Sequence, residues 1–389
     1  MNIHNNRMNR IDSIDESKCC GCLACESICP QSAILMTENE KGFIMPSIND
    51  ENCVNCGLCL KVCDFKKPKQ TKSNIERAFS LVVNDKDVLK NSTSGGAFTA
   101  LSDVVLGRSG CVVGSVMDDD FTIRHVIAED KTGRDKMRGS KYVQSNTQGI
   151  WKQVKSLLSL GRVVLFTGTP CQCAALCSFL GKDYDNLIVV DFLCHGVPNN
   201  KMFKEHIDYL NKYYKSSSVG FSFRNKTYGW DSYNNNNNLS NGKTKTKWIN
   251  QIYYNFFVNN LSLRSSCHQC PYRSFHRPSD ITIADFWGIE KLTGEKDREG
   301  VSLVLTHSEK GLDLVKKATE NCQVREYPAE SVMFRISTAP SKPNVKCDVF
   351  WETYIKHGYR GVASQYFSNS RKNRIKFEIR KIAKKLRIG

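Results

Sequence analysis

Between residues 77 and 218, short hydrophobic runs alternate with helical patterns. The runs FSLVV, CVVGSVM, VVLFT and LIVVDFL are apolar and rich in valine, which is typical of strands buried in a sheet. Helical patterns open near Ser94 and after Pro170, and two more surround IWKQVKSLLSL and MFKEHIDYL. This alternation predicts an α/β core with an at least partly parallel sheet.

Outside this core the pattern is less regular. Residues 17–66 hold two short strand-like pieces, 33–36 and 43–45, between two cysteine-rich runs, and KKPKQTKSN after them is a polar linker. From about residue 219 the chain is irregular, and its composition predicts YNNNNNLS to be an exposed loop or hairpin tip. We therefore divide the sequence into 1–16, 17–66, 67–76, 77–218, 219–345 and 346–389.

Composition places the chain among ordinary globular proteins, since 389 residues with 40% hydrophobic content suffice for two or three cores. The polar N-terminus lacks the apolar stretch of a signal peptide, and NLIVVDFL, the most apolar later stretch, is short and broken by Asp191. Eighteen cysteines in such a chain favour a reducing compartment in which thiolates bind metals. We expect a cytoplasmic protein without a membrane span.

The formal net charge of +17 is concentrated at the C-terminus, where residues 371–389 hold nine Lys and Arg against one Glu. No zinc-finger, RRM or KH signature accompanies it, so we expect no nucleic-acid binding. A helical stripe in this tail combines apolar residues with surrounding cations: Ile375, Ile379, Ile382 and Leu386. The pattern predicts a basic amphipathic helix that contacts an anionic membrane surface or an acidic protein, with a fully solvated helix as the alternative.

Two cysteine runs repeat the CxxCxxCxxxC spacing of bacterial ferredoxins, and the first ends in Pro30. In this spacing three cysteines of one run bind a [4Fe–4S] cluster and the fourth reaches the other cluster. We assign the first cluster to Cys19, Cys22, Cys25 and Cys63. We assign the second cluster to Cys53, Cys56, Cys59 and Cys29.

Zinc is the alternative metal for these runs, because CxxC pairs also bind tetrahedral zinc. Two complete four-cysteine repeats favour [4Fe–4S] clusters. Cys20 falls outside the spacing and is interpreted as a spare thiol. Asp64 stands where a second proline is usual, which affects the local turn and not the ligands.

Further cysteines follow the central strands. Cys171 lies near the start of the helix after VVLFT, where free N–H groups stabilise a thiolate, and Cys194 follows the next strand. The carboxyl edge of an open α/β sheet is where ligands bind. With Cys267 and Cys270 of CHQC, three segments offer four thiolates for a third [4Fe–4S] cluster or for zinc.

Six motifs in order, STSGGAFTAL, MRGSKYVQS, FTGTPCQ, DFLCHGVPN, CHQCPY and SDITIADFWG, resemble the coenzyme F420 hydrogenase/dehydrogenase beta subunit family over roughly residues 77–330. The resemblance implies an iron–sulfur flavoprotein in which FAD beside a [4Fe–4S] cluster links one-electron and two-electron carriers. Such members include deazaflavin-using subunits and a plant chlorophyll-derivative reductase. The resemblance also assigns the additional cluster to Cys171, Cys194, Cys267 and Cys270.

TSGGAF is a candidate binding segment for FAD. It begins a helix with two glycines, which allow a phosphate to approach the backbone closely. In RGSKYVQS, Lys141 is a candidate cation for phosphate or for a reduced flavin, and Tyr142 is a candidate stacking ring, although a surface lysine beside a core tyrosine is the alternative. Trp287 edges this pocket or belongs to the core. The candidate cofactor-binding residues are Ser94, Gly95, Gly96, Ser140, Lys141, Tyr142, Thr169 and Asp285.

His195 and Lys141 are the candidate catalytic residues. His195 either protonates a reduced substrate or flavin or satisfies a hydrogen bond in its turn. Adjacent residues on an extended strand point to opposite faces, which disfavours a Cys194–His195 nucleophile–base pair. Cys171 and Cys173 could form a redox dithiol, but the resemblance assigns Cys171 to a cluster.

Together these features predict a flavin- and iron–sulfur-dependent oxidoreductase. We expect electrons to pass from a reduced ferredoxin or another redox protein to an organic substrate or a deazaflavin coenzyme, or in the reverse direction. The alternative is a non-catalytic electron-transfer subunit that docks onto a separate catalytic protein.

Overall fold

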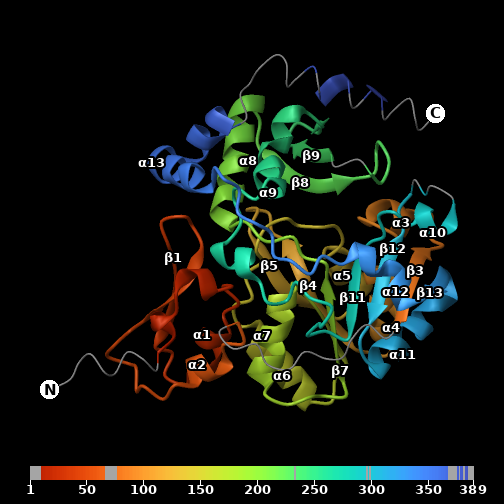
Figure 1. The fold of residues 1–389 in the computed structure, drawn as a ribbon, viewed down its shortest axis with the longest axis horizontal. Coiled ribbons are helices and arrows are strands. Elements are labelled where there is room, and N and C mark those ends of the chain that lie inside the picture. The colour runs from red at the N-terminus through yellow and green to blue at the C-terminus, as the bar shows by residue number, and fades with distance from the viewer. Residues whose placement is uncertain are drawn as a thin grey trace.

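The fold is that of a computed structural model, which describes residues 10–65, 77–231, 234–294, 297, 299–366, 375, 377–379 and 382–383. Its centre is an eight-stranded sheet of order β13-β3-β12-β11-β7-β6-β4-β5 (Figure 1). The strands are β3 (Arg77–Val83), β4 (Cys111–Met117), β5 (Ile123–Ala128), β6 (Val164–Thr167), β7 (Leu187–Phe192), β11 (Ile281–Asp285), β12 (Ser302–Thr306) and β13 (Cys322–Tyr327). Neighbours from β11 to β4 pair in parallel and the outer pairs are antiparallel. The predicted α/β core with a partly parallel sheet is confirmed.

Helices cover both faces of this sheet. One face packs against α6 (Ile150–Ser159) and α7 (Pro170–Leu180), and the other against α4 (Ala97–Leu106) and α11 (Glu309–Ala318). Val164, Leu165 and Phe166 of β6 are completely buried, because a parallel strand between two helical layers has no solvent face. This double burial explains why the strands appear in the sequence as continuous apolar runs.

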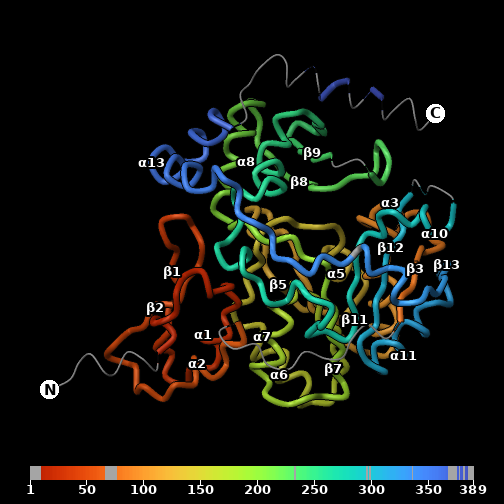
Figure 2. Tube along the Cα trace, viewed as in Figure 1, coloured from red at the N-terminus to blue at the C-terminus, as the bar shows by residue number. Residues whose placement is uncertain are grey.

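The cysteine-rich unit lies beside α6 and α7, where the trace runs from red to orange (Figure 2). It contains α1 (Ala24–Ile28), α2 (Leu58–Val62) and an antiparallel pair, β1 (Ile34–Glu38) and β2 (Ile44–Ile48). Ala24 and Val62 share one hydrophobic cluster with Trp151 and Phe179 of the α/β core. The unit is therefore packed on the core through a continuous apolar interface.

A second layer above the sheet is built around aromatic side chains (Figure 1). It contains α8 (Asn200–Tyr214), α9 (Ile252–Val258), α13 (Cys347–Tyr366) and a three-stranded sheet of β8 (Ser218–Asn225), β9 (Asn234–Leu239) and β10 (Thr244–Lys245). The helix α13 bends at Gly358, whose φ is 63°. The buried rings include Phe203, Phe223, Tyr253, Phe256 and Tyr359.

The prediction that the asparagine run is an exposed loop or hairpin tip is wrong. The run forms β9, in which Asn235 and Asn237 are fully buried, and the Asn235 side chain donates to the Phe223 carbonyl at 2.6 Å. The prediction relied on the polarity of asparagine, which favours contact with water. In the structure, pairing with β8 supplies hydrogen bonds that replace those with water. The region after residue 219 also supplies β11, β12 and β13 to the main sheet.

Short elements complete the described chain. They are α3 (Lys86–Asn91), α5 (Lys131–Asp135), α10 (Glu290–Thr293), α12 (Ala329–Val332) and 3₁₀ turns at Ile11–Ser13, Glu16–Lys18, Trp248–Gln251, Ser265–Gln269, Thr319–Asn321 and Met333–Arg335. In the tail, Ile375, Ile379 and Ile382 are 51%, 60% and 57% exposed, and Leu386 lies outside the described residues. Within the described ranges, no helix has both the length and the hydropathy needed to cross a membrane.

Candidate functional site

The first predicted set of cysteines comes together in the loop before α1 and at the end of α2. Burial, and then the neighbouring thiols of Cys22, Cys19 and Cys63, raise the pKa of Cys25 well above its usual value. Gly21 has a φ of 62°, and a Cβ there would lie 2.8 Å from Nη1 of Arg264. The tight CxxC loop therefore requires glycine at this position.

The second predicted set also comes together, at the outer end of the unit. Cys29, Cys53, Cys56 and Cys59 line one cavity. Gly57, with a φ of 71°, turns the chain into α2 directly after Cys56. Cys56 is exposed, so this set lies at the protein surface.

The third predicted set gathers at the carboxyl edge of the main sheet. Its members come from the start of α7, the end of β7 and the 3₁₀ turn at Ser265–Gln269, and they line one cavity: Cys171, Cys194, Cys267 and Cys270. Thr169 caps α7 and its hydroxyl lies 3.1 Å from the Cys171 sulfur. Burial, and then the thiols of Cys267, Cys171 and Cys270, raise the pKa of Cys194.

The three cysteine sets are defined by the cavities that their members line together and by the effect of neighbouring thiols on the pKa of Cys25 and Cys194. Within the described residues, no three or more His, Cys, Asp or Glu side chains form a group that could hold a metal ion. A single zinc ion needs its four ligands at about 2.3 Å, whereas the thiolates of a [4Fe–4S] cluster bind separate irons. Four thiolates per set suit either centre chemically.

Cys20 belongs to the third cavity as well, which the sequence did not indicate. It is 8% exposed and lines the cavity together with Cys171. Hydrogen bonds with Cys171 and Cys22, together with burial, raise the pKa of Cys20, and the same bond from Cys20 lowers the pKa of Cys171 to about 7. The doubled cysteine in KCCGC is the one sequence signal for this position.

Core side chains hold four successive carbonyls of the first cysteine loop. None of these contacts was predicted: Gln144 lies within MRGSKYVQS, and Arg264, Thr147 and Trp151 lie outside the six motifs. The bonds run from Arg264 Nε to Cys19 (2.6 Å), Gln144 Nε2 to Cys20 (2.8 Å) and Gly21 (3.1 Å), and Thr147 Oγ1 and Trp151 Nε1 to Cys22 (2.9 Å each).

Asp64, which replaces the expected proline, forms a second link to the third set. The Tyr272 hydroxyl donates to the buried Asp64 carboxylate at 2.6 Å, and Phe65 packs edge-on against the same ring. Tyr272 follows Cys270 by two residues, and Asp64 directly follows Cys63. Asp64, in place of the usual proline, therefore supplies a contact between the unit and the core.

The two glycines of TSGGAF face the main sheet. A Cβ on Gly95 would lie 2.0 Å from the Leu81 carbonyl oxygen, and Gly96, with a φ of 90°, packs on Val83. The Ser94 hydroxyl donates to the Val301 carbonyl at 2.6 Å. Close packing on β3 and β12 thus accounts for this glycine pair.

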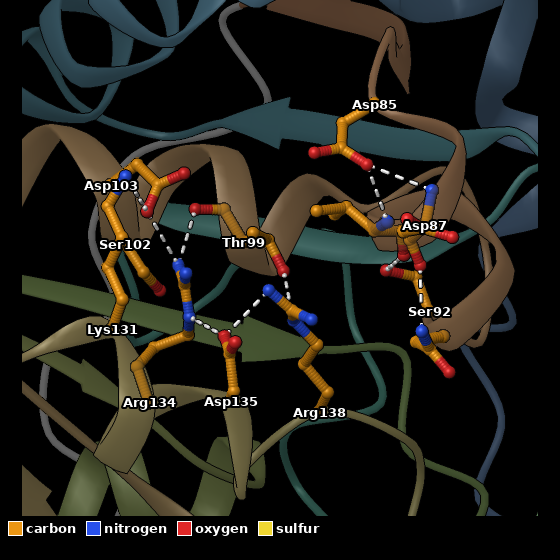
Figure 3. A network of polar contacts seen from close by, with 12 residues as sticks. Asp85, Asp87, Ser92, Thr99, Ser102, Asp103, Lys131, Arg134, Asp135 and Arg138 are labelled. Carbon is orange, nitrogen blue, oxygen red and sulfur yellow. Dashed lines mark hydrogen bonds and ion pairs between the residues drawn. The ribbon is translucent and has the colours of Figure 1, made fainter.

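Lys141 lies in a loop that α5 holds against α4. Figure 3 shows Arg134 and Arg138 sharing Asp135 and reaching Thr99 of α4. The Lys141 ammonium donates to the carbonyls of Met137, Arg138 and Gly139 at 2.8, 3.1 and 3.2 Å. Burial lowers the pKa of Lys141 to about 7, and the neighbouring Ser140 amide donates to the Thr93 hydroxyl at 2.9 Å.

Other predicted cofactor residues meet around a cation that the sequence did not indicate. Arg224 at the end of β8 donates to Asp285 at 3.1 Å and to the Tyr142 hydroxyl at 3.3 Å. Lys226 donates to the Ser94 carbonyl at 2.7 Å. Trp230 donates to Asp285 at 2.8 Å and stacks on Trp287 at 4.2 Å. We call this group the Arg224 cluster: Ser94, Tyr142, Arg224, Lys226, Trp230, Asp285 and Trp287.

One aromatic ring connects the third set with the Arg224 cluster. His195, next to Cys194, contacts Phe257 edge-on at 5.0 Å, and Tyr142 stacks on the same ring at 4.8 Å. Burial lowers the pKa of His195. Cys173 is buried in α7 with its sulfur 3.7 Å from the Gly168 carbonyl, so it packs against the strand ends and lies outside the third cavity lining.

Two family models match separate parts of the chain. Residues 161–331 match the family that comprises the C-terminal part of the coenzyme F420 hydrogenase/dehydrogenase beta subunit, and residues 18–67 match the 4Fe-4S dicluster domain. The resemblance seen in the motifs is confirmed. Residues 161–331 are therefore similar to this beta subunit family, and residues 18–67 are similar to 4Fe-4S dicluster domains.

Individual proteins are similar to this chain as well, and two of them illustrate the likeness. Uncharacterized protein MJ1349 of Methanocaldococcus jannaschii is 27% identical over 206 residues, which cover 44% of this chain and 56% of that protein, so the chain spans little more than half of its relative. The solved structure of the xenon-derivatized F420-reducing [NiFe] hydrogenase complex from Methanosarcina barkeri matches at 20% identity with a TM-score of 0.46, covering 77% of this chain and 93% of that chain.

Proposed function

We propose that this protein is a flavin-dependent iron–sulfur oxidoreductase that exchanges electrons between a ferredoxin-like protein and a two-electron organic or deazaflavin partner. The position of Cys20 carries the proposal, because it lines the cavity of the third set while its neighbours Cys19 and Cys22 belong to the first set. The second set ends at the surface with exposed Cys56. A series of thiol sets from surface to interior suits electron transfer.

The proposed ligands are the three sets of four cysteines, and FAD is proposed to bind at the Arg224 cluster. When bound, the clusters supply one-electron transfer and FAD supplies the change between one-electron and two-electron chemistry. The chain's own contribution is to fix distances and exclude water. Arg264, 2% exposed, holds the first cysteine loop on the core and lines the cavity of the third set.

The Arg224 cluster fits a planar, anionic cofactor by its donor chemistry. Arg224 and Lys226 supply positive charge, and the stacked rings of Trp230 and Trp287 supply a flat apolar surface. Lys141, with a pKa of about 7, can hold or release a proton near neutral pH. Ser140, Thr169 and His195 complete the proposed set, with His195 as the proton donor on the side of the third cysteine set.

Metal and flavin analysis of anaerobically purified protein tests the proposal. Three [4Fe–4S] clusters give about twelve irons and about twelve acid-labile sulfides per chain, and FAD gives about one flavin. About eight irons with one zinc would eliminate the third cluster. Absence of flavin after reconstitution would overturn the oxidoreductase assignment, and bound flavin that reacts with redox proteins alone would favour the electron-transfer subunit.

The exposed isoleucines of the C-terminal segment support a proposed surface contact at this end of the chain. Because the surrounding charge is basic, binding to anionic vesicles should weaken as salt increases. A truncation ending at Ser370 should lose this binding. Equal vesicle binding by the truncated protein would rule out the tail as a membrane contact.

A further inference from the structure

We propose that Ser341 is a positioning residue of the third cysteine set, which fixes the segment of Cys194 relative to the CHQC segment, residues 267–270. This inference rests on the proposed function, in which the third set holds a [4Fe–4S] cluster. Ser341 lies outside the cavity lining, so it would act through neighbouring residues that line the cavity.

Ser341 belongs to a connecting segment, residues 336–346, which joins the 3₁₀ turn at Met333–Arg335 to α13. In Figure 2 this segment runs across the molecule from the main sheet to the second layer. Pro340 and Pro343 flank Ser341, and each fixes its own φ at about −65°, which restricts the backbone on both sides. Although the segment forms no helix or strand, Ser341 is only 7% exposed.

The Ser341 hydroxyl joins the two segments that carry the cysteines. It donates to the His195 carbonyl at 2.6 Å and accepts from Nη1 of Arg273 at 3.1 Å. The same Nη1 donates to the Cys194 carbonyl at 3.2 Å. His195 and Arg273 both line the third cavity, and Arg273 stands three residues after Cys270. One hydroxyl and one guanidinium therefore connect both segments from behind the cavity.

Further bonds hold the connecting segment in place. The Ser341 carbonyl accepts from Nδ1 of His268 at 2.7 Å, inside the CHQC segment. Two bonds join residues 342–344 to the turn after α9, one donated by Asn260 at 2.8 Å and one donated by Asn344 at 2.9 Å. None of these three bonds uses the Ser341 hydroxyl. Removing the hydroxyl alone should therefore leave the segment in place.

The third set depends on such links more than the ferredoxin-type sets do. Each ferredoxin-type set takes three ligands from one CxxCxxC run, so local spacing fixes their separation. The third set draws its four cysteines from three separate segments. Loss of the outer partners that orient metal ligands typically weakens metal binding about 10- to 100-fold. Loss of the Ser341 hydroxyl should therefore weaken the third centre and leave the other two unchanged.

The test compares Ser341→Ala with Ser341→Thr, which keeps the hydroxyl, and with Ser337→Ala. Ser337 is the matched control, because it is an exposed serine of the same segment whose hydroxyl donates to the Ala339 carbonyl at 3.2 Å. Each protein is purified anaerobically, and the iron that it releases to a chelator is followed with time. We expect about four of about twelve irons to leave Ser341→Ala at least about tenfold faster than the wild type, while the other irons leave at the wild-type rate. Ser341→Thr and Ser337→Ala should release iron within about threefold of the wild-type rate.

EPR of the reduced protein gives a second readout, which a general loss of stability would not move. The signal that is missing in Cys270→Ala belongs to the third centre. We expect this signal alone to change in Ser341→Ala and to return to its wild-type form in Ser341→Thr.

Each other outcome overturns the inference or the proposed function. Wild-type iron release in Ser341→Ala, an equal increase in Ser337→Ala, or faster release of all irons would remove the positioning role. Release from Ser341→Thr as fast as from Ser341→Ala would assign the effect to packing. Where Ser341→Ala does not fold, Arg273→Met removes the same link from the other segment and should release the same irons faster.

The wild-type metal content separates the two proposals. About eight irons with one zinc would contradict the proposed third cluster, and the rate of zinc release would then decide the role of Ser341 by the same comparison. About eight irons without zinc would contradict both proposals.

Discussion

Arg264 donates from Nε to the carbonyl of Cys19 at 2.6 Å, and its Nη2 donates to the Ile44 carbonyl at the same distance. Arg264 stands three residues before Cys267, in the segment that carries the third cysteine set. Its own amide donates to the Val197 carbonyl at 2.9 Å, close to Cys194. One buried guanidinium thus fixes the first cysteine loop relative to two segments of the third set.

Replacing this guanidinium should destabilise the folded protein. Arg264→Met removes the donor to the part-buried carbonyls of Cys19 and Ile44, and each such loss costs about 1–3 kcal/mol. We expect the free energy of unfolding to fall by about 3 kcal/mol, measured by anaerobic urea unfolding. Arg77→Ala is the control, because Arg77 is 51% exposed and its ion pair with Glu326 contributes less than about 1 kcal/mol. Equal losses in both variants would contradict the role of Arg264.

The second link between the unit and the core gives an independent prediction. Tyr272→Phe removes the donor to the Asp64 carboxylate, so we expect a loss of about 2 kcal/mol in unfolding free energy. Adding Asp64→Leu should recover part of this loss, because the carboxylate no longer lacks a partner. Tyr213→Phe, at a 37% exposed tyrosine, serves as the control in the same urea experiment. Strictly additive effects of the two changes would show that the residues are not coupled.

The sequence was sufficient for features that depend on neighbouring residues. β6 and β7 could be predicted because burial on both faces makes a strand continuously apolar. The eight cysteines of the two N-terminal runs could be grouped because ferredoxin spacing is a local geometric constraint. The two predicted sets, each with three cysteines of one run and the fourth of the other, come together in the structure.

Features that depend on distant contacts could not be predicted. Arg224, Lys226 and Arg264 are ordinary cations in the sequence, and only the fold brings them to Asp285, Ser94 and Cys19. Cys20 lay outside the spacing, so its position at the third cavity required the docked arrangement of two units.

Composition led to a wrong prediction for the asparagine run of β9. The glycine motif left the role of Gly95 and Gly96 undecided. Asn235 of β9 is buried because its side chain donates to the Phe223 carbonyl and its strand pairs with β8. The Gly95–Gly96 pair suggested a phosphate loop, but contact with the Leu81 carbonyl is sufficient to require a residue without a side chain at Gly95. Both cases show that a local pattern does not specify which partner satisfies it.

A buried histidine should make stability depend on pH. Burial lowers the pKa of His206 from 6.5 to about 3, and its Nδ1 hydrogen-bonds with the Tyr359 hydroxyl at 2.7 Å. As the pH falls below 6.5 the unfolded chain binds a proton that the folded protein does not, so stability is lost between pH 6.5 and 3. From pH 7 to 5 this loss is about 2 kcal/mol.

His206→Gln should reduce the pH dependence of the unfolding free energy by that amount. The measurement is urea unfolding at pH 5, 6 and 7, taking the difference from wild type at each pH. His276→Gln, at an exposed histidine, should leave the slope unchanged. A wild-type slope in His206→Gln would mean that His206 is protonated in the folded protein.

The Arg224 cluster predicts a specific effect on flavin. Arg224→Met removes the cation that contacts Asp285 and Tyr142, and we expect flavin to bind at least tenfold more weakly, about 1.4 kcal/mol. Flavin fluorescence after equilibrium dialysis measures the change. Arg325→Met changes an exposed arginine on β13 and should bind flavin as the wild type does. Full flavin occupancy and affinity in Arg224→Met would place the flavin elsewhere.

The final prediction concerns the role of the third cysteine set, because this set lies between the first cysteine set and the Arg224 cluster. Cys270→Ala is preferred to a change at Cys171, since Cys171 is in the first turn of α7 and its loss could disturb folding. We expect iron to fall from about twelve to about eight per chain, while the two ferredoxin-type clusters remain and are still reduced.

In the same variant, reduction of bound flavin by reduced ferredoxin should slow at least tenfold, a barrier increase of about 1.4 kcal/mol. Stopped-flow absorbance under anaerobic conditions measures this rate, after circular dichroism and flavin content have confirmed folding. Cys322→Ala, at a half-exposed cysteine of β13 outside all three sets, should keep both the iron and the rate. Undiminished flavin reduction in Cys270→Ala would place the third set away from the route of the electrons, because the ferredoxin-type clusters would then reach the flavin without it.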